Sequence, residues 1–132
     1  MQSALVLAVM LLVAIGGYFF VDSSDALDAA RVQMQGTWVS ADDPTFVREY
    51  EENGTVIDTQ GGEVSQKSGR WTLFTKEMPV EGYSHDLQEK HIYLAVGFTE
   101  TPTLHFRIET INARNLSLVS LESGAVLTFV KK

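Results

Sequence analysis

The chain divides into one uninterrupted apolar stretch and a longer part in which hydrophobic and polar residues alternate. Residues 4–21 contain no charged side chain. At about 1.5 Å per residue, a helix of that length nearly spans the hydrocarbon core of a bilayer. The polar and acidic run from Asp22 to Asp25 ends the stretch. The pattern predicts a transmembrane anchor helix over residues 1–21.

Two other interpretations of this segment stay open. A secretory signal peptide has an apolar region of about 7 to 15 residues between a basic start and a small-residue cleavage site. Here the residues before position 4 include no Lys or Arg, and Ser24-Asp25-Ala26 is a poor cleavage site. A buried core helix would need protein on every face, which a small domain cannot supply. The uncleaved anchor is favoured, and the short N-terminus predicts a single-pass membrane protein with its C-terminal domain outside the cytoplasm.

Residues 22–35 form a linker that is predicted to contain a short helix. Asp25 caps its start, and Leu27, Arg31 and Met34 fall on one stripe of it. After Gly36 the pattern changes to short alternating runs separated by Gly, Asn, Asp and Pro, which indicates strands and turns. The predicted strands are residues 36–40, 45–51, 55–60, 68–75, 90–97, 103–111, 116–121 and 126–131.

Three turns predict how these strands pair. Asn53-Gly54 is a strong signal for a two-residue hairpin turn, which sets Tyr50 opposite Ile57 and Glu49 opposite Asp58. A second turn at Ser123-Gly124 sets Leu118 opposite Phe129 and Ser120 opposite Leu127. The third hairpin turns at residues 98–102, and its expected pairs are Val96 with Leu104, Leu94 with Phe106 and Ile92 with Ile108. In the last hairpin all the paired residues are apolar and share one face, so this face is predicted to pack inward and the other to meet water.

Short antiparallel strands with one dry face close most naturally into a barrel, because closure removes the exposed edges. The predicted fold of residues 36–132 is therefore all-β: an eight-stranded antiparallel up-and-down barrel, preceded by the linker helix and the membrane anchor.

Gly36-Thr37-Trp38 begins the first strand, directly after the predicted short helix. This arrangement resembles the lipocalin family and the wider calycin group, in which a Gly-x-Trp motif opens an eight-stranded barrel. The motif recurs at Gly69-Arg70-Trp71. The resemblance implies that Trp38 lies across the closed end of the barrel and packs against a basic side chain of the last strand, Lys131 or Lys132.

The resemblance also implies a binding site for a small apolar ligand or lipid inside the barrel. The candidate lining residues are Tyr50, Ile57, Trp71, Leu94, Phe106 and Phe129. The alternative is that side chains fill the interior, so that the module is structural or contacts a protein partner through its outer face or rim. A cavity of about 300 Å³ or more, open at one end, would favour the ligand, and a filled interior with an exposed aromatic patch would favour the protein partner.

Composition and motifs exclude several other functions. The chain of 132 residues has no cysteine, which excludes a disulfide scaffold, a thiolate nucleophile and a cysteine zinc site. The net charge of -7 argues against a nucleic-acid partner. His91 and His105 lie roughly 13 Å apart along their strands, too far to share a zinc ion, and His85 lies in a predicted loop. No nucleophile or phosphate-binding motif is present. We therefore expect no catalytic residues, no metal and no cofactor.

Overall fold

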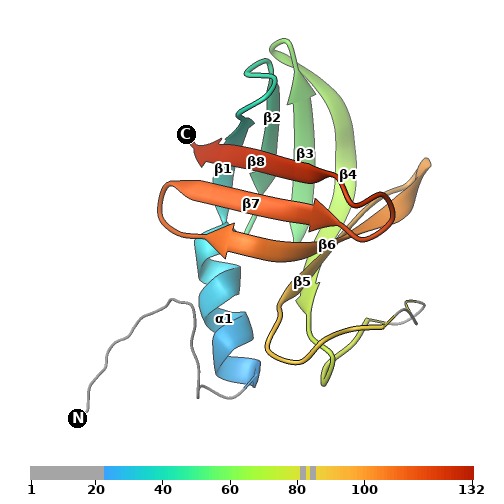
Figure 1. Ribbon diagram of the computed structural model, residues 1–132. Coiled ribbons are helices and arrows are strands. Elements are labelled where there is room, and N and C mark those ends of the chain that lie inside the picture. The colour runs from blue at the N-terminus through green and yellow to red at the C-terminus, as the bar shows by residue number, and fades with distance from the viewer. Residues whose placement is uncertain (1–22, 81–82, 84–85) are drawn as a thin grey trace.

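The computed structural model describes residues 23–80, 83 and 86–132 (Figure 1), and for residues 23, 24, 67 and 68 it describes the backbone only. The predicted anchor over residues 1–21 lies outside these residues, and so does His85. Within the described part of the chain, no helix is long and apolar enough to cross a membrane.

The strands form a closed antiparallel barrel in which each strand pairs with its neighbours in chain order and β1 pairs with β8. This confirms the predicted eight-stranded up-and-down barrel. The helix expected in the linker is present as α1. The elements are α1 (Ser23–Met34), β1 (Gly36–Ser40), β2 (Phe46–Tyr50), β3 (Thr55–Gln60), β4 (Glu63–Phe74), β5 (Tyr93–Phe98), β6 (Thr101–Ile111), β7 (Asn115–Ser120) and β8 (Val126–Lys131).

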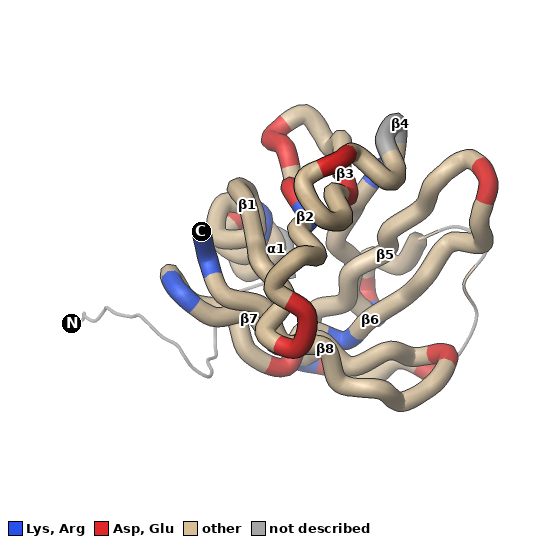
Figure 2. The backbone as a smooth tube through the Cα atoms, turned by 90° about the horizontal axis from the view of Figure 1, so that it is seen from above, with Lys and Arg blue, Asp and Glu red and all other residues tan. Residues whose placement is uncertain are grey.

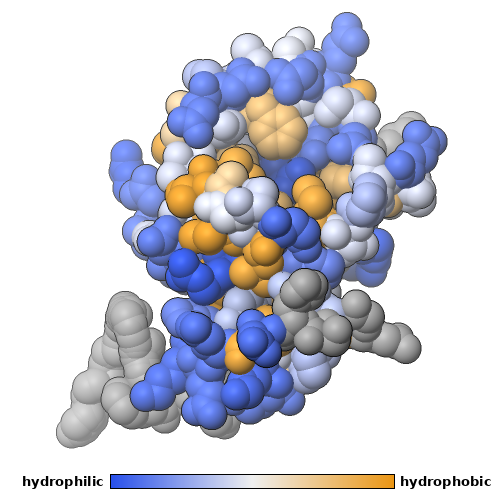
Figure 3. Space-filling view, turned by 45° about the vertical axis from the view of Figure 1, so that its right-hand side comes forward, coloured by the Kyte–Doolittle hydropathy of each residue, from blue (hydrophilic) through white to orange (hydrophobic). Residues whose placement is uncertain are grey.

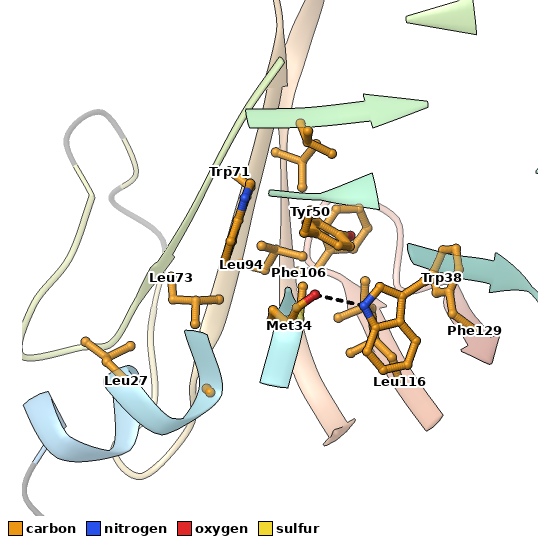
Figure 4. Close-up of a cluster of buried hydrophobic side chains, with 14 residues drawn as sticks. Leu27, Met34, Trp38, Tyr50, Trp71, Leu73, Leu94, Phe106, Leu116 and Phe129 are labelled. Carbon is orange, nitrogen blue, oxygen red and sulfur yellow. Dashed lines mark hydrogen bonds between the residues drawn. The ribbon is translucent and has the colours of Figure 1, made fainter. Parts of the chain in front are cut away.

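Helix α1 lies against one end of the barrel (Figure 1), which we call the α1 end. Leu27, Ala30 and Met34 are buried there and belong to the same hydrophobic cluster as the barrel core (Figure 4). Arg31 stays partly exposed and pairs with Asp28 on the helix surface. The opposite end, which we call the far end, is formed by the loops after β1, β3, β5 and β7.

The pairing predicted around Asn53-Gly54 is wrong by one residue. Tyr50 pairs with Val56, and Arg48 pairs with Asp58. The turn is longer than a two-residue hairpin, because the Glu51 amide bonds the Thr55 carbonyl and Gly54 alone in the turn takes a positive φ of 93°. A shift of one residue exchanges the two faces of a strand, so Ile57 moves to the outer face and Asp58 to the interior.

The other two hairpins keep their predicted faces. Val96 pairs with Leu104 and Leu94 with Phe106, as predicted. Around Ser123-Gly124 the register is displaced by two residues: Leu118 pairs with Leu127 and Leu116 with Phe129. The turn there spans Leu121 to Gly124, since the Ser120 amide donates to the Ala125 carbonyl. A displacement of two leaves each side chain on the same face.

Part of the outer face of β5 is buried, although the sequence pattern predicted that this whole face is exposed to water. Tyr93 and Ala95 are buried with Phe74 in a second hydrophobic cluster outside the barrel. Side chains of the segment between β4 and β5 cover it, together with Leu121. Leu104, predicted to face inward, is 43% exposed, because the β5–β6 hairpin extends past the barrel (Figure 1).

Candidate functional site: a filled barrel interior

Side chains fill the interior of the barrel (Figure 4). The largest fully buried ones include Trp38, Tyr50, Leu94, Leu116 and Leu118. Two hollows, of about 330 and 640 Å³, both lie on the outer surface. The smaller is lined by Arg70, Trp71, Thr72, Ala95, Gly97 and Thr103, and the larger by Thr37, Pro44, Thr45, Val47, Glu49, Thr59, Gly61, Gly62 and Lys132.

Of the candidate ligand-lining residues, the structure brings all but one together. Tyr50, Trp71, Leu94, Phe106 and Phe129 are buried in the barrel core. Ile57 lies on the outer face opposite Glu49, and Val56 takes its place inside.

Sequence reasoning missed a charged pair inside the barrel. The guanidinium of Arg48 donates to both carboxylate oxygens of Asp58, from Nε at 2.6 Å and from Nη2 at 2.8 Å. Both residues are buried. Burial alone would lower the pKa of Arg48, but its hydrogen bonds and the charges nearby, chiefly those of Asp58, raise it above its ordinary value. The Arg48 guanidinium therefore stays charged, with the hydrogen-bonded partner that a buried charge requires.

This pair also separates two carboxylates that the sequence placed together. Glu49 lies on the outer face opposite Ile57, whereas Asp58 points inward to Arg48. The Glu49–Asp58 pair that the two-residue turn predicts is therefore not formed. The sequence does allow the observed pair. Moving the predicted register of β2 and β3 by one residue sets Arg48 opposite Asp58.

Aromatic rings cover the charged pair on the side of the far end. The Arg48 guanidinium lies 5.5 Å from the ring centre of Phe46 and 5.9 Å from that of Phe98, within the range of cation–π attraction. Phe98 in turn packs on Gly69, where a side chain would have no room. The far end is therefore closed by aromatic side chains, with Gly69 as the position that lets Phe98 fold inward.

We expect Gly69→Ala to lower the free energy of unfolding by about 1–3 kcal/mol through overpacking. The added Cβ would stand 2.7 Å from Val56 Cγ1 and closer still to the Phe98 ring. Urea unfolding followed by tryptophan fluorescence measures the change. Gly124→Ala is unsuitable as a control because its φ is positive, so Thr72→Ala on the exposed face of β4 serves instead. A Gly69→Ala variant as stable as the parent would contradict the close packing of Phe98.

The hydroxyl of Tyr50 lies beside the charged pair without a hydrogen-bond partner. It is the sole buried side-chain polar atom left unpaired among the described residues. Burial raises the pKa of Tyr50 above its ordinary value, and the charge of Arg48 together with a polar interaction between the hydroxyl and the guanidinium opposes that rise only in part. The ring itself is held edge-on against Trp71, with ring centres 5.5 Å apart. The hydroxyl thus has the Arg48 guanidinium as its polar neighbour but makes no hydrogen bond of good geometry.

We expect Tyr50→Phe to raise the free energy of unfolding by about 1 kcal/mol, because it removes a buried hydroxyl whose desolvation no hydrogen bond offsets. The ring and its contact with Trp71 are kept. Thermal and urea unfolding of the two proteins measure the difference. A loss of more than about 1 kcal/mol would instead show that a water molecule or a ligand pairs with the hydroxyl.

At the α1 end, Trp38 joins the helix to the barrel. Its Nε1 donates to the Met34 carbonyl at 2.8 Å (Figure 4). Lys131 Nζ lies 4.5 Å from the Trp38 ring centre and donates to the Gln35 carbonyl at 2.7 Å. Of the two lysines considered, Lys131 is therefore the one that packs on the tryptophan. Gly36, with a φ of 120°, leaves room for the lysine, since a Cβ there would be 2.7 Å from Lys131 Cε.

The histidines do not form a cluster in the described part of the chain. His105 bonds Glu122 through Nδ1 at 2.7 Å, and Glu122 also accepts from the His105 amide. Burial opposes ionisation of Glu122, but these bonds lower its pKa overall. His91 stands against Tyr93, and burial followed by the Arg107 charge lowers its pKa. No group of three or more potential ligands for a metal is found among the described residues.

The loops at the far end of the barrel are acidic. Seen from the far end, the loops there carry acidic residues (Figure 2). The loops 41–45, 61–62, 99–100 and 121–125 contain Asp42, Asp43, Glu100 and Glu122, and no Lys or Arg. Lys131 and Lys132 lie at the α1 end. A partner that approached the far end would therefore meet negative charge.

Comparisons with protein-family models, with curated proteins and with solved structures found no significant match to this chain.

Proposed function

We propose that this protein is a membrane-tethered, extracytoplasmic module of lipocalin-like type that acts without catalysis, by contacting a protein partner through its outer surface. The observation that carries the proposal is the barrel interior, which side chains fill from the α1 end to the far end. A drug-sized ligand needs a hollow of about 300–1,000 Å³ that buries most of its surface. The two hollows described above both lie outside the barrel.

The outer surface offers apolar contacts instead. Figure 3 shows hydrophobic side chains gathered at mid-height on one face, between hydrophilic residues above and below. The large hydrophobic residues exposed among those described are Val32, Val64, Met78, Leu104, Val126 and Val130. The apolar area gathered on the face in Figure 3 is where we expect a protein partner to make contact.

The lipocalin-like part of the proposal is supported by the α1 end. A Gly-x-Trp sequence opens β1 after a short helix, and the tryptophan packs under a basic side chain of the last strand. The tether is supported by the apolar run of residues 4–21 directly before α1.

Native mass spectrometry of the full chain, purified in detergent from its own membrane, tests this proposal. We expect the mass of the intact 14.6 kDa chain, with residues 1–21 retained and no small molecule released on unfolding. A stoichiometric small molecule would contradict the filled barrel. A mass lacking the first twenty or so residues would contradict the tether and support a cleaved signal peptide.

A second candidate function is the binding of a small ligand inside the barrel, and the unpaired Tyr50 hydroxyl favours it. The hydroxyl and the adjoining Arg48 offer hydrogen-bond donors in an otherwise apolar interior. Side chains would have to move to admit a ligand. On this candidate, Tyr50→Phe would lose the small molecule that the parent chain carries in the same mass measurement.

A further inference from the structure

The outer face of β8, β1 and β2 carries a row of valines. Val39 on β1 pairs with Val130 on β8 and with Val47 on β2. All three side chains point outward, because the residues beside them along each strand are buried in the barrel. Both pairings of β1 are free of bulges, and Val130 is 45% exposed. The row is therefore an apolar stripe on a regular part of the sheet.

A second row, two residues nearer the α1 end, carries two charges of opposite sign. Glu49 on β2 pairs with Thr37 on β1. Lys132 lies on the other side of Thr37, since its amide donates to the Thr37 carbonyl at 2.9 Å. Two strand spacings, about 9–10 Å, thus separate the backbones of Glu49 and Lys132. Neither side chain takes part in an ion pair within the described residues.

The larger surface hollow lies on the β2 side of these two rows. Its lining includes Val47 and Glu49 of β2 and Thr59 of β3, whereas none of the residues of β8 lines it. The surface is low there because Thr59 is short and Gly61 and Gly62 have no side chain. A side chain that another molecule projects over Val47 therefore finds room.

The two rows are complementary to their own copies. When two molecules face each other across a two-fold axis that runs along β1 and over Val39, the β8 side of each lies against the β2 side of the other. Val130 of each copy then stands over Val47 of the other copy, where the hollow lies. Lys132 of each copy likewise faces Glu49 of the other, so two pairs of opposite charges form.

We propose that two copies of this chain associate face to face through β8, β1 and β2, with the two-fold axis along β1. The inference rests on the proposed interaction function and deepens it, by naming a second copy as one partner. Sheets that pack face to face keep their strand directions within about 30° of each other. An axis along β1 meets this condition, because it sets the β1 strands of the two copies parallel. Two-fold dimers are also the commonest symmetric assembly.

The direction of the axis agrees with the proposed tether. Helix α1 leads directly into β1 (Figure 1), so an axis along β1 places the α1 ends of both copies on the same side. Two chains held in one bilayer require this arrangement. The contact is small, which is typical of weak and transient complexes. Copies confined to one membrane meet at a high effective concentration, which offsets the weakness.

Cross-linking of the full chain in detergent micelles tests the contact, because the natural sequence contains no cysteine. We expect Thr37→Cys, on the axis, to give a covalent dimer with a bifunctional thiol reagent that spans about 10 Å, the separation of packed sheets. Thr72→Cys, on the exposed face of β4, is the matched control and stays monomeric. A Thr37→Cys chain that forms no more dimer than this control would overturn the proposal.

A charge exchange separates this arrangement from any other contact. Glu49→Lys and Lys132→Glu, each alone, set like charges opposite one another at both pairs. We expect each to raise the dimer dissociation constant roughly tenfold, measured by sedimentation equilibrium in the same micelles. The double variant Glu49→Lys/Lys132→Glu restores opposite signs, and we expect it to dimerise like the parent chain. Single changes without effect, or a double variant that fails to recover, would overturn the proposed axis.

The two proposals fail on different measurements. A monomeric Thr37→Cys chain that carries no small molecule overturns the face-to-face dimer and leaves the interaction function standing, with another partner. A small molecule released from the barrel overturns the interaction function, whichever oligomeric state the cross-linking shows.

Discussion

Asp58→Ala is expected to lower the free energy of unfolding by about 3–5 kcal/mol, the largest effect of any single polar change in this barrel. The change leaves the Arg48 guanidinium buried and charged, without the carboxylate that accepts its two hydrogen bonds. Arginine cannot escape by losing its proton, because its pKa is far above any working pH. The unpaired interior charge therefore lowers the free energy of unfolding directly. Urea unfolding followed by tryptophan fluorescence measures the decrease.

Two variants show whether the cost comes from the unpaired charge. The double change Arg48→Met/Asp58→Leu removes both charges and is expected to stay within about 2 kcal/mol of the parent, because apolar side chains of similar volume replace buried ion pairs well. Asp28→Ala removes the partner of Arg31 on the exposed surface of α1, and is expected to change stability by less than about 0.5 kcal/mol. An Asp58→Ala effect as small as that of Asp28→Ala would show that water reaches Arg48.

The hydrophobic alternation was enough to predict the barrel, because every strand has one face that must be buried. The β5–β6 hairpin shows this best: three apolar pairs on one face leave only one register that keeps them together, and β5 and β6 pair in it. The short helix was likewise readable from Leu27 and Met34, both of which are buried.

The buried pair of Arg48 and Asp58 was not predicted, because its formation depends on the length of the turn between β2 and β3. With a two-residue turn at Asn53-Gly54, Asp58 faces outward. With the longer turn that forms, it faces Arg48. Both turns are compatible with the same dipeptide. A buried charge could be anticipated only by asking which register gives Arg48 an acidic partner.

The first half of β4 was missed for a different reason. Residues 63–68 are mostly polar, so they lack the alternation that indicates a half-buried strand. The signal that remains is Gly61-Gly62, whose positive φ values of 62° and 87° form the tight turn from β3 into β4. A strand that is paired on one side only, and points few apolar side chains inward, leaves little trace in a sequence.

Trp38→Ala is the second large effect, an expected loss of about 3–5 kcal/mol of unfolding free energy. The indole is fully buried and contributes packing area, the hydrogen bond to the Met34 carbonyl and the contact with Lys131. Without it the last turn of α1 loses its bond to the barrel. We therefore expect faster amide hydrogen exchange throughout α1, measured by mass spectrometry under conditions where the barrel remains folded.

Trp71→Phe separates loss of the helix contact from a general loss of stability. Trp71 donates from Nε1 to the Glu51 carbonyl, at a turn that does not involve α1. The variant should destabilise the barrel without selectively increasing exchange in the helix. If exchange in α1 is unchanged in Trp38→Ala as well, Leu27 and Ala30 suffice to hold the helix. If it rises selectively, the tryptophan at the start of β1 is the residue that holds α1 against the end of the barrel.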